Sequence, residues 1–382
     1  MKQRILVLGA GVGGLVTANE LRKKLSKEHE IIIFEKEETF SFAPSYLWIM
    51  MGNRKPHDIQ RNYQSLSKKG ITLVQGVIDS IDPKNIHVSV NGKDYHGDYM
   101  IISLGAEFSS DSYGLSKAGY NFYTLDGATN FYNALSKISE GKIILLTAAP
   151  AYKCPAAPYE AALLVEYYLR KKKIRNKVKI DLYSAEPMPM GVTGHDVSHA
   201  VRQMLESRNI YYHPEHQVKE VNTDNRILHF SNGVSAQYDL LGFVPVHHAS
   251  RITQSAGLLN DAGWISVDRH SLETKFPKVY AIGDITSIPL KLGKPLPKAG
   301  VFAHGQAEIV AHNIACLIKG KGKPKLFEGF GQCFLETGDG KAALGKGNFY
   351  AEPLPDIKLF EPGRHWHAAK VLFEKDWFRR WF

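Results

Sequence analysis

Short apolar runs alternate with longer segments of helical pattern through most of this chain of 382 residues. Residues 5–8 and 31–34 form the first two apolar runs, and residues 15–25 between them have a helical pattern. Unbroken apolar runs this short, bounded by glycine or by charge, are typical of strands buried in a parallel sheet. The alternation of such strands with helices predicts an α/β fold.

The glycines after the first run form a dinucleotide-binding signature. Gly9, Gly11 and Gly14 give the spacing G-x-G-x-x-G between strand and helix, and Glu35 ends the second strand. In such a unit the first glycine makes the tight turn, the second lets the pyrophosphate approach the backbone, and the third lets helix and strand pack closely. The acidic residue accepts hydrogen bonds from the ribose hydroxyls. This pattern predicts a dinucleotide site near the start of the chain.

A second unit of the same kind begins at an apolar run over residues 142–146. A helix over residues 159–171 and a strand over 178–183 are expected to complete it. The turn at residues 147–151 holds no glycine, and Pro150 removes a backbone donor. We therefore expect the architecture to persist without a phosphate cradle, which argues against a nicotinamide dinucleotide there.

Two further segments indicate which dinucleotide the first site takes. Residues 278–284 form a predicted strand that ends in Gly283 and Asp284, and residues 101–106 form one that runs into Gly105. Both segments resemble elements of the flavoproteins with two dinucleotide-binding domains, in which the aspartate holds the ribityl chain. This resemblance implies FAD rather than NAD at the first site.

Composition and charge narrow the class of protein. Three cysteines in a chain of this length exclude a disulfide-stapled secreted scaffold. We expect no signal peptide, and no run reaches the roughly 18 apolar residues that span a bilayer. The formal net charge of +10 permits attraction to anionic surfaces, but nothing resembles a nucleic-acid-binding module. No pattern has metal-ligand spacing, so we expect neither a nucleic-acid partner nor a bound metal.

Two of the cysteines follow nucleotide-binding elements, although they lie far apart in the sequence. Cys154 stands just after the first strand of the second unit, and Cys333 lies beyond the last FAD-like segment. Because free cysteines are commonly buried core residues, simple core packing is the alternative for both. If the two meet over a flavin, thiol–flavin redox chemistry follows. Cys316 lies within an apolar helical segment and is expected to pack in the core.

The final segment, residues 364–382, has an amphipathic helical pattern with arginine and lysine beside an aromatic face. Such a helix can lie in a membrane interface with its aromatic side chains down and its cations on anionic headgroups. The alternative is a helix docked on its own domain or at a dimer interface. The predicted aromatic face comprises Trp366, Ala369, Phe373, Trp377 and Trp381.

The chain resembles the sulfide:quinone oxidoreductases, which are related to the flavoprotein subunit of flavocytochrome c sulfide dehydrogenase. The resemblance covers essentially the whole chain, and its most specific parts are residues 154–160, 280–284 and 296–302 together with Cys333. It implies an α/β fold of two Rossmann-like domains of the FAD/NAD-linked disulfide oxidoreductase type, with a C-terminal region for membrane and quinone binding. Residues 42–48 resemble the quinone-linked branch and hold no flavin-linking cysteine, so we expect non-covalent FAD.

The same resemblance implies roles for individual residues. Cys154 and Cys333 form a redox disulfide beside the flavin. Glu160 manages protons near that pair, with a surface helix carboxylate as the alternative. Lys298, which opens a predicted helix, faces the flavin pyrimidine edge, with a surface lysine as the alternative. The residues expected to bind FAD are Gly9, Gly11, Gly14, Glu35, Lys36, Ser45, Ile78, Gly105, Gly283, Asp284, Lys298, Ala299 and Gly300.

The implied activity is oxidation of sulfide to persulfide, polysulfide or zero-valent sulfur, with electrons passed through FAD to a membrane quinone. Many relatives carry a third cysteine before the second unit, and residues 109–129 hold none, which argues against growth of long polysulfides on the enzyme. Weaker candidates for the sulfur pocket are His195, His199, His247 and His248. Candidates for quinone contact are Phe330, Phe334, Phe349, Tyr350 and Phe360.

Three alternatives stay open. The first is an NADH:quinone oxidoreductase of the same fold, which would leave Cys154 unexplained. The second is a flavoprotein subunit that passes electrons to a cytochrome, and the third is a non-catalytic FAD-bound redox sensor. A homo-oligomer is also open.

The expected domains follow from these segments. Residues 1–107 form the first part of the FAD domain, 108–250 the second Rossmann-like domain with Cys154, 251–325 the second part of the FAD domain, and 326–382 the C-terminal region with Cys333 and the amphipathic helix. Together with a quinone acceptor, the tail predicts a peripheral, monotopic membrane protein. The expected absence of a signal peptide favours the cytoplasmic face.

Overall fold

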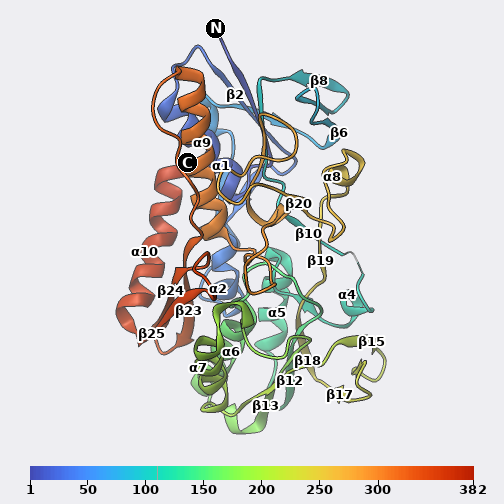
Figure 1. Cartoon of the computed structure of the whole chain (residues 1–382). Helices are drawn as coiled ribbons and strands as arrows, with labels where there is room; N and C mark the ends of the chain where they lie inside the picture. Colours follow the sequence, from blue (N-terminus) through green and yellow to red (C-terminus); the bar gives the residue numbers. More distant parts are fainter. Residues whose placement is uncertain (110) are drawn as a thin grey trace.

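The computed structural model describes residues 1–109 and 111–382, and two five-stranded parallel sheets form its framework (Figure 1). The first sheet has the strand order β21-β9-β1-β2-β5, and each neighbouring pair in it is parallel. A strand from late in the chain therefore completes a sheet that the N-terminal segment begins. The strands are β1 (Arg4–Leu8), β2 (Glu30–Glu35), β5 (Thr72–Gln75), β9 (Tyr99–Ile102) and β21 (Val279–Ala281).

Helices α1 (Val12–Lys24) and α9 (Gly300–Lys319) pack against each other beside this sheet. Helix α1 begins at Val12, three residues before the predicted start at residue 15, because the glycine segment already forms its first turn. A side chain at Gly14 would place Cβ only 1.8 Å from the carbonyl oxygen of Gly9. The close approach of helix and strand therefore requires glycine at this position.

The second sheet has the order β11-β18-β12-β13-β14 and is also parallel throughout. It contains the predicted second unit at its centre, so the α/β prediction holds for both halves of the chain. Its strands are β11 (Tyr120–Asn121), β12 (Gly141–Thr147), β13 (Val178–Ser184), β14 (Ile210–His213) and β18 (Leu240–Val244), and its main helices are α5 (Leu125–Leu135), α6 (Ala157–Lys171) and α7 (His195–Glu206).

An antiparallel ribbon of β10 (Ala106–Phe108) and β19 (His247–Ala249) lies where the chain passes between the two sheets. The domain boundaries at residues 107, 250 and 325 stay a prediction.

Smaller elements lie around the two sheets: β3 (Thr39–Ser41), β4 (Gln60–Asn62), β6 (Ile78–Asp82), β7 (His87–Val90), β8 (Lys93–His96), β15 (Val218–Asn222), β16 (Ile227–Phe230), β17 (Ser235–Gln237), β20 (Ile265–Ser266), β22 (Thr286–Ser287), α2 (Tyr46–Met50), α3 (Ser65–Lys68), α4 (Leu115–Ala118) and α8 (Arg251–Ser255).

The chain ends in an antiparallel sheet of β23 (Phe330–Gly338), β24 (Lys341–Asn348) and β25 (Asp356–Gly363), followed by helix α10 (Arg364–Trp381). This sheet packs against α6 and α9, and Figure 1 shows α10 running along the same side of the molecule as α9. No helix among residues 1–109 and 111–382 has the length and apolar character needed to cross a bilayer.

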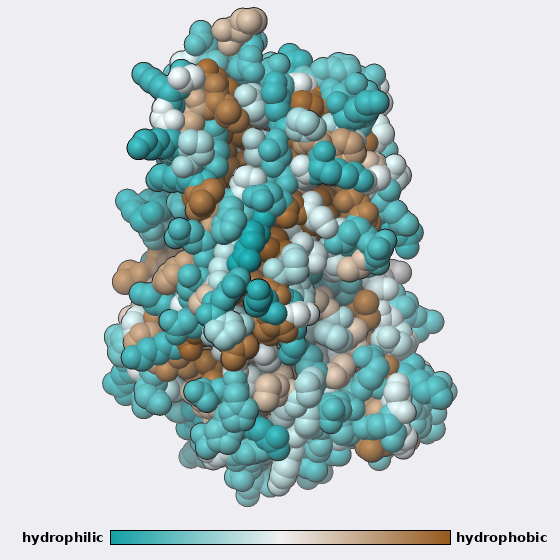
Figure 2. Space-filling model, viewed as in Figure 1, coloured by the Kyte–Doolittle hydropathy of each residue, from teal (hydrophilic) through white to brown (hydrophobic). Residues whose placement is uncertain are grey.

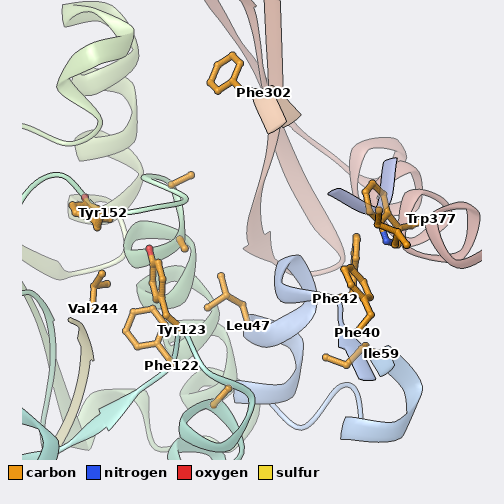
Figure 3. Packing of buried hydrophobic residues seen from close by; sticks show 14 of the residues in the cluster. Phe40, Phe42, Leu47, Ile59, Phe122, Tyr123, Tyr152, Val244, Phe302 and Trp377 are labelled. Carbon is orange, nitrogen blue, oxygen red and sulfur yellow. The ribbon is translucent and has the colours of Figure 1, made fainter. Parts of the chain in front are cut away.

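The predicted aromatic face of α10 is wrong in its membership. Trp377 and Trp381 are buried, and Trp377 packs between Phe40 and Phe42 of the first domain (Figure 3). Of the predicted face Phe373 does point outward, at 42% exposure, and the neighbouring Leu372, which was not predicted, is 65% exposed. The docked helix that was the alternative accounts for the tryptophans, because burial of their large surface stabilises the attachment of α10.

Candidate active site

The turn between β1 and α1 has the geometry of a phosphate cradle. Gly9 has a φ of +91°, which only glycine adopts readily. A Cβ at Gly11 would meet nothing within 4 Å, so the space beside this backbone is open at the N-terminus of α1. Glu35 closes the turn, because its Oε2 accepts a hydrogen bond of 2.8 Å from the Ala10 backbone and its Oε1 one of 2.9 Å from Lys36. These features fit the diphosphate and ribose of a dinucleotide.

Asp284 supplies a second part of that site. Its carboxyl group is buried, and its Oδ1 has no hydrogen-bond partner within the described part of the chain. Burial raises the pKa of this carboxyl, although Lys153 and Lys298 oppose the change. A buried, unsatisfied acceptor is costly unless a ligand donates to it. Asp284 therefore suits a polyhydroxyl chain such as that of FAD, and the residues present fit the cofactor.

Lys298 is nearly buried at 6% exposure, which excludes the surface-lysine alternative. Its ammonium donates to the carbonyl oxygens of Asp284 at 2.7 Å and Thr286 at 2.9 Å, and it lies 3.3 Å from the centre of the Trp264 ring. Burial lowers the pKa of Lys298 to about 8, although Asp284 opposes this. The residue does not open a helix, because α9 begins at Gly300.

The structure brings Cys154 and Cys333 together from different elements. Cys154 lies in the loop after β12 with a φ of +51°, an unusual backbone conformation that is enriched at functional sites. Its backbone N–H donates to the Lys298 carbonyl at 2.6 Å, and its carbonyl accepts from the Tyr123 hydroxyl at 3.0 Å. The loop is thus fixed to both domains.

The two thiols are free in this structure rather than joined in the expected disulfide. The two side chains are close enough to interact, and this interaction raises the pKa of Cys154 while it lowers the pKa of Cys333. A reduced pair in direct contact is one of the two states that a redox disulfide must adopt.

A buried charged cluster lies next to the cysteines. Glu160, 3% exposed in the first turn of α6, forms an ion pair with Lys370 of α10, which excludes the surface-carboxylate alternative. Burial raises the pKa of Glu160, and Lys370 opposes the change. Burial lowers the pKa of Lys370, but the carboxylates of Glu160 and Glu336 outweigh it and raise that pKa. His367 Nδ1 lies 2.9 Å from Glu336 and extends the cluster toward solvent.

Other predicted cofactor-binding residues have mixed placements. Gly105 has a φ of +69° and open space beside it, and Gly283 has a φ of +75° with its N–H donating to Gln306. Ser45 is fully buried, but its hydroxyl donates to Glu374 of α10 rather than facing the cradle. Lys36 is exposed, Ile78 begins β6, Ala299 caps α9 and Gly300 is its first residue.

The histidine candidates separate into two groups. His195 and His199 are exposed on α7, whereas His247 is buried in β19 near the Cys154 loop, with His248 half-buried beside it. Cys316 is half-buried and contacts His312 at 3.5 Å, so the prediction that it packs in the core is wrong.

A surface groove lies between β23 and α10 and has a volume of about 580 Å³. Phe334, one of the quinone candidates, lines it, whereas Phe349 is buried against Phe302. Because side chains alternate along a strand, Phe334 and Cys333 point to opposite faces of β23. The groove is lined by Gln332, Phe334, Ala369, Leu372, Phe373, Lys375, Asp376, Arg379 and Arg380.

In the second Rossmann-like unit, two side chains of the protein contact each other at the position that corresponds to the nucleotide site of the first unit. Glu186 lies two residues beyond β13, close to the position that corresponds to Glu35 after β2. The Tyr152 hydroxyl donates to its Oε2 at 2.8 Å, and Tyr152 itself is buried. The carboxylate that would bind a ribose is therefore engaged by the loop that lacks the glycines.

Sequence reasoning missed Lys153, Tyr123, Lys370, Glu336 and His367. Lys370 carried a usable signal, since it shares a helical face with Glu374, Trp377 and Trp381 at steps of four, three and four residues. Charged residues on the same face as buried tryptophans indicate partners inside the protein. The other residues carry no local pattern, because their neighbours come from distant segments.

Two nucleotide-binding folds, an FAD-type cradle and an adjacent pair of thiols together define a flavin-linked disulfide oxidoreductase. The chain matches the model of the family described as pyridine nucleotide-disulphide oxidoreductase over residues 3–307, and it belongs to that family. It is thus a flavin-dependent oxidoreductase of the predicted fold class.

Among individual proteins, the chain is similar to sulfide:quinone oxidoreductases. The sulfide-quinone reductase of Aquifex aeolicus is 28% identical over 98% of this chain and 90% of its own length. The mitochondrial sulfide:quinone oxidoreductase of Mus musculus is 24% identical over 92% of this chain and 79% of its own length. The solved structure of the Aquifex aeolicus sulfide:quinone oxidoreductase covers 99% of this chain and 91% of that chain with a TM-score of 0.90 and 26% identity. The resemblance predicted from the sequence is thereby confirmed.

Proposed function

We propose that this protein oxidises sulfide at the Cys154–Cys333 pair and passes the electrons to a quinone. One observation carries the proposal: the two thiols are interacting neighbours, and the Cys154 backbone N–H donates to the carbonyl oxygen of Lys298 in the expected flavin site. The thiols thus adjoin the place where the residues fit FAD. The similarity to sulfide:quinone oxidoreductases supports the same substrates.

The sulfur chemistry begins from the oxidised pair. Hydrosulfide attacks one sulfur of the Cys154–Cys333 disulfide, so that a new S–S bond forms and the old one breaks. One cysteine becomes a persulfide and the other leaves as a thiolate, which conserves charge and electrons. A second sulfur nucleophile then removes the terminal persulfide sulfur. The two thiolates close the disulfide again as two electrons leave the pair.

Bound non-covalently, FAD would supply the two-electron acceptor for that last step. Gly9, Gly11 and Glu35 would hold its diphosphate and adenosine ribose, and Asp284 would hold its ribityl chain. Lys298 would place a positive charge beside the ring that becomes negative on reduction. Its ammonium is already oriented by two carbonyl oxygens, so little reorganisation is needed.

The buried cluster would handle the protons of the cycle. Glu160 and Lys370 lie beside the thiols, and both contribute to the field at Cys333. Glu336 and His367 continue the cluster toward the surface. Cys154 is half-buried and Cys333 is exposed, and a chain of titratable groups from this pair to solvent allows proton release to accompany electron transfer.

The groove between β23 and α10 is the proposed quinone site. Its volume of about 580 Å³ lies within the usual range for ligand sites, and its lining combines apolar side chains, among them Phe334 and Phe373, with polar and charged ones. Figure 2 shows apolar side chains gathered on the side where Figure 1 places α10 and β25. Exposed Leu372 and Phe373 with Arg379 and Arg380 nearby would hold this side on a membrane, where a lipid-soluble quinone is available.

The test is anaerobic reduction of the purified yellow protein. Sulfide should bleach the oxidised-flavin absorbance, a soluble quinone should restore it, and NADH should have no effect. Bleaching by NADH alone would instead support the NADH:quinone alternative. No response to either reductant would support the redox sensor.

Cysteine variants sharpen that test. Cys154→Ser and Cys333→Ser should each retain bound flavin and lose sulfide-dependent bleaching, by a factor of at least about 1,000, because the disulfide cannot form. Cys316→Ser is the matched control and should behave as the unmodified protein. Turnover that survives loss of either pair member would contradict the proposal.

A further inference from the structure

A buried histidine near the cysteine loop has a ring nitrogen that the protein does not use. His247 is 8% exposed, and its Nδ1 lies 2.8 Å from the carbonyl oxygen of Pro245. Because Nδ1 faces an acceptor, it carries the proton, and Nε2 presents a lone pair. Nε2 is buried and has no partner among the residues that the structure describes. Such an atom costs free energy unless a ligand donates to it.

The ammonium groups of Lys153 and Lys298 lie near His247. The Lys153 Nζ lies 4.5 Å from the centre of the Phe108 ring, and the His247 ring meets the same ring edge-on at 4.9 Å. Burial, followed by the charges of Lys153 and Lys298, lowers the pKa of His247 to about 3. The imidazole is therefore neutral at ordinary pH, and the local field favours an anion.

The Lys153 ammonium is itself uncommitted. Within the described chain it takes part in no ion pair and no hydrogen bond, and its neighbour is the Phe108 ring. Burial lowers its pKa, while Asp284 and Cys154 oppose the change. Lys153 is half-buried, and a partly desolvated cation without a direct partner would be stabilised by a bound anion.

Both groups are fixed to the cysteine loop. Lys153 directly precedes Cys154, and its backbone pairs with Lys298 in an isolated parallel bridge. The Tyr123 ring lies edge-on to His247 at 5.8 Å, and the Tyr123 hydroxyl donates to the Cys154 carbonyl. An anion held by Lys153 and His247 would therefore lie close to the reactive pair.

We propose that Lys153 and the Nε2 atom of His247 form a binding subsite for hydrosulfide beside Cys154. Lys153 neutralises its charge, and His247 accepts a hydrogen bond from its S–H group. This inference rests on the proposed function and assigns two residues to substrate binding within it. In the step that follows, the hydrosulfide sulfur bonds to one cysteine sulfur, the other leaves as a thiolate, and His247 takes no proton.

The experiment measures flavin bleaching against sulfide concentration in an anaerobic stopped-flow instrument. Lys153→Met and His247→Phe should each raise the half-saturating sulfide concentration about tenfold, since each removes an interaction with a charged ligand, and should change the limiting rate less. Lys153→Arg keeps the charge and should stay close to the unmodified protein. His248→Phe is the matched control, because neighbouring side chains of a strand point to opposite faces.

Thiocyanate provides a second readout, which begins with the unmodified protein. As a small anion without an S–H group it should compete with sulfide through Lys153 alone, and Lys153→Met should weaken that inhibition about tenfold. Flavin content and thermal unfolding check that each variant is folded.

The outcomes separate this inference from the proposed function. If sulfide does not bleach the unmodified protein, the proposed function fails. If sulfide bleaches it but Lys153→Met and His247→Phe leave the half-saturating concentration unchanged, only the subsite is overturned. Inhibition by thiocyanate that is not competitive with sulfide also overturns the subsite.

Discussion

At the scale of single residues, the site contains an ion pair that is almost completely removed from water. Glu160 and Lys370 are both almost fully buried and come from helices 210 residues apart in the sequence. Neither charge would be stable alone in that environment. Their pairing joins α10 to the second domain directly beside the thiols.

Removing one member of this pair should destabilise the protein strongly. We expect Glu160→Gln and Lys370→Met each to lower the free energy of unfolding by about 3 kcal/mol, because each leaves an uncompensated buried charge or acceptor. Urea unfolding of the flavin-bound protein measures the change.

The double variant is the informative control. Replacement of both charges should cost clearly less than the sum of the two single changes, since no unpaired charge remains. Additive losses would mean that the two side chains do not act as a pair.

A second residue-scale prediction concerns Glu186. Burial raises the pKa of this carboxyl above its ordinary value of 4.5, with the Tyr152 hydroxyl opposing. The folded state therefore keeps the proton longer than the unfolded state, and the contribution of Glu186 to stability falls as pH rises above about 4.5. In Glu186→Gln, which keeps an acceptor for Tyr152, that fall should be absent. Unfolding free energies of both proteins from pH 4 to 7 check this, and parallel curves would refute it.

At the scale of elements, α10 shows what the sequence could and could not predict. The helix itself was predictable from its periodicity, whereas its inward face was not. The predicted stripe ran from Trp366 through Phe373 to Trp377 and Trp381. The buried stripe shares only the two tryptophans Trp377 and Trp381 with it and adds Lys370, Glu374 and Phe378. The two charged members gain their partners from Glu160 of α6 and from Ser45 just before α2, and those contacts have no signal in the local sequence.

Substitutions on the buried and exposed sides of α10 should affect different properties, stability on the buried side and membrane binding on the exposed side. Trp377→Ala should lower stability by about 3–5 kcal/mol, because the indole fills the space between Phe40 and Phe42. Phe373→Ser, on the exposed side, should change stability by less than about 1 kcal/mol and weaken binding to lipid vesicles. Thermal unfolding and vesicle co-sedimentation measure the two effects. A vesicle-binding defect in Trp377→Ala at full folding, with none in Phe373→Ser, would contradict this assignment.

At the scale of the whole molecule, the sequence predicted the sheets and the cofactor cradle because both depend on local backbone requirements. The spacing of Gly9, Gly11 and Gly14 shows such a requirement directly in the sequence, and Asp284 ends a predicted strand. The meeting of Cys154 with Cys333 depends on how two domains and a C-terminal sheet pack. For that reason it followed from the family resemblance and not from any spacing. The juxtaposition of Lys153 and His247 depends on the same packing: the sequence offered His247 as one of four weaker histidine candidates and gave no sign of Lys153.

The net charge of +10 gives a prediction for the complete protein. Binding to vesicles with anionic lipid should exceed binding to neutral vesicles and should weaken as salt is raised, because exposed cations are screened within roughly 10 Å at 0.1 M. Replacement of Arg379 and Arg380 together by glutamine should reduce binding to anionic vesicles about tenfold. Each cation near an anionic surface contributes about 1 kcal/mol to binding, and the ion pairs of both arginines with Asp376 reduce that contribution. Co-flotation measures the bound fraction, and binding insensitive to salt would contradict an electrostatic contribution.

The hydrogen bond from Tyr152 to Glu186 bears on which electron donor can reduce the protein in a cell. Together with the glycine-free turn before it, this bond leads us to expect that NADH does not bind at the second unit. Reduction of the protein would then depend on the supply of sulfide and not on the ratio of reduced to oxidised nicotinamide in the cell.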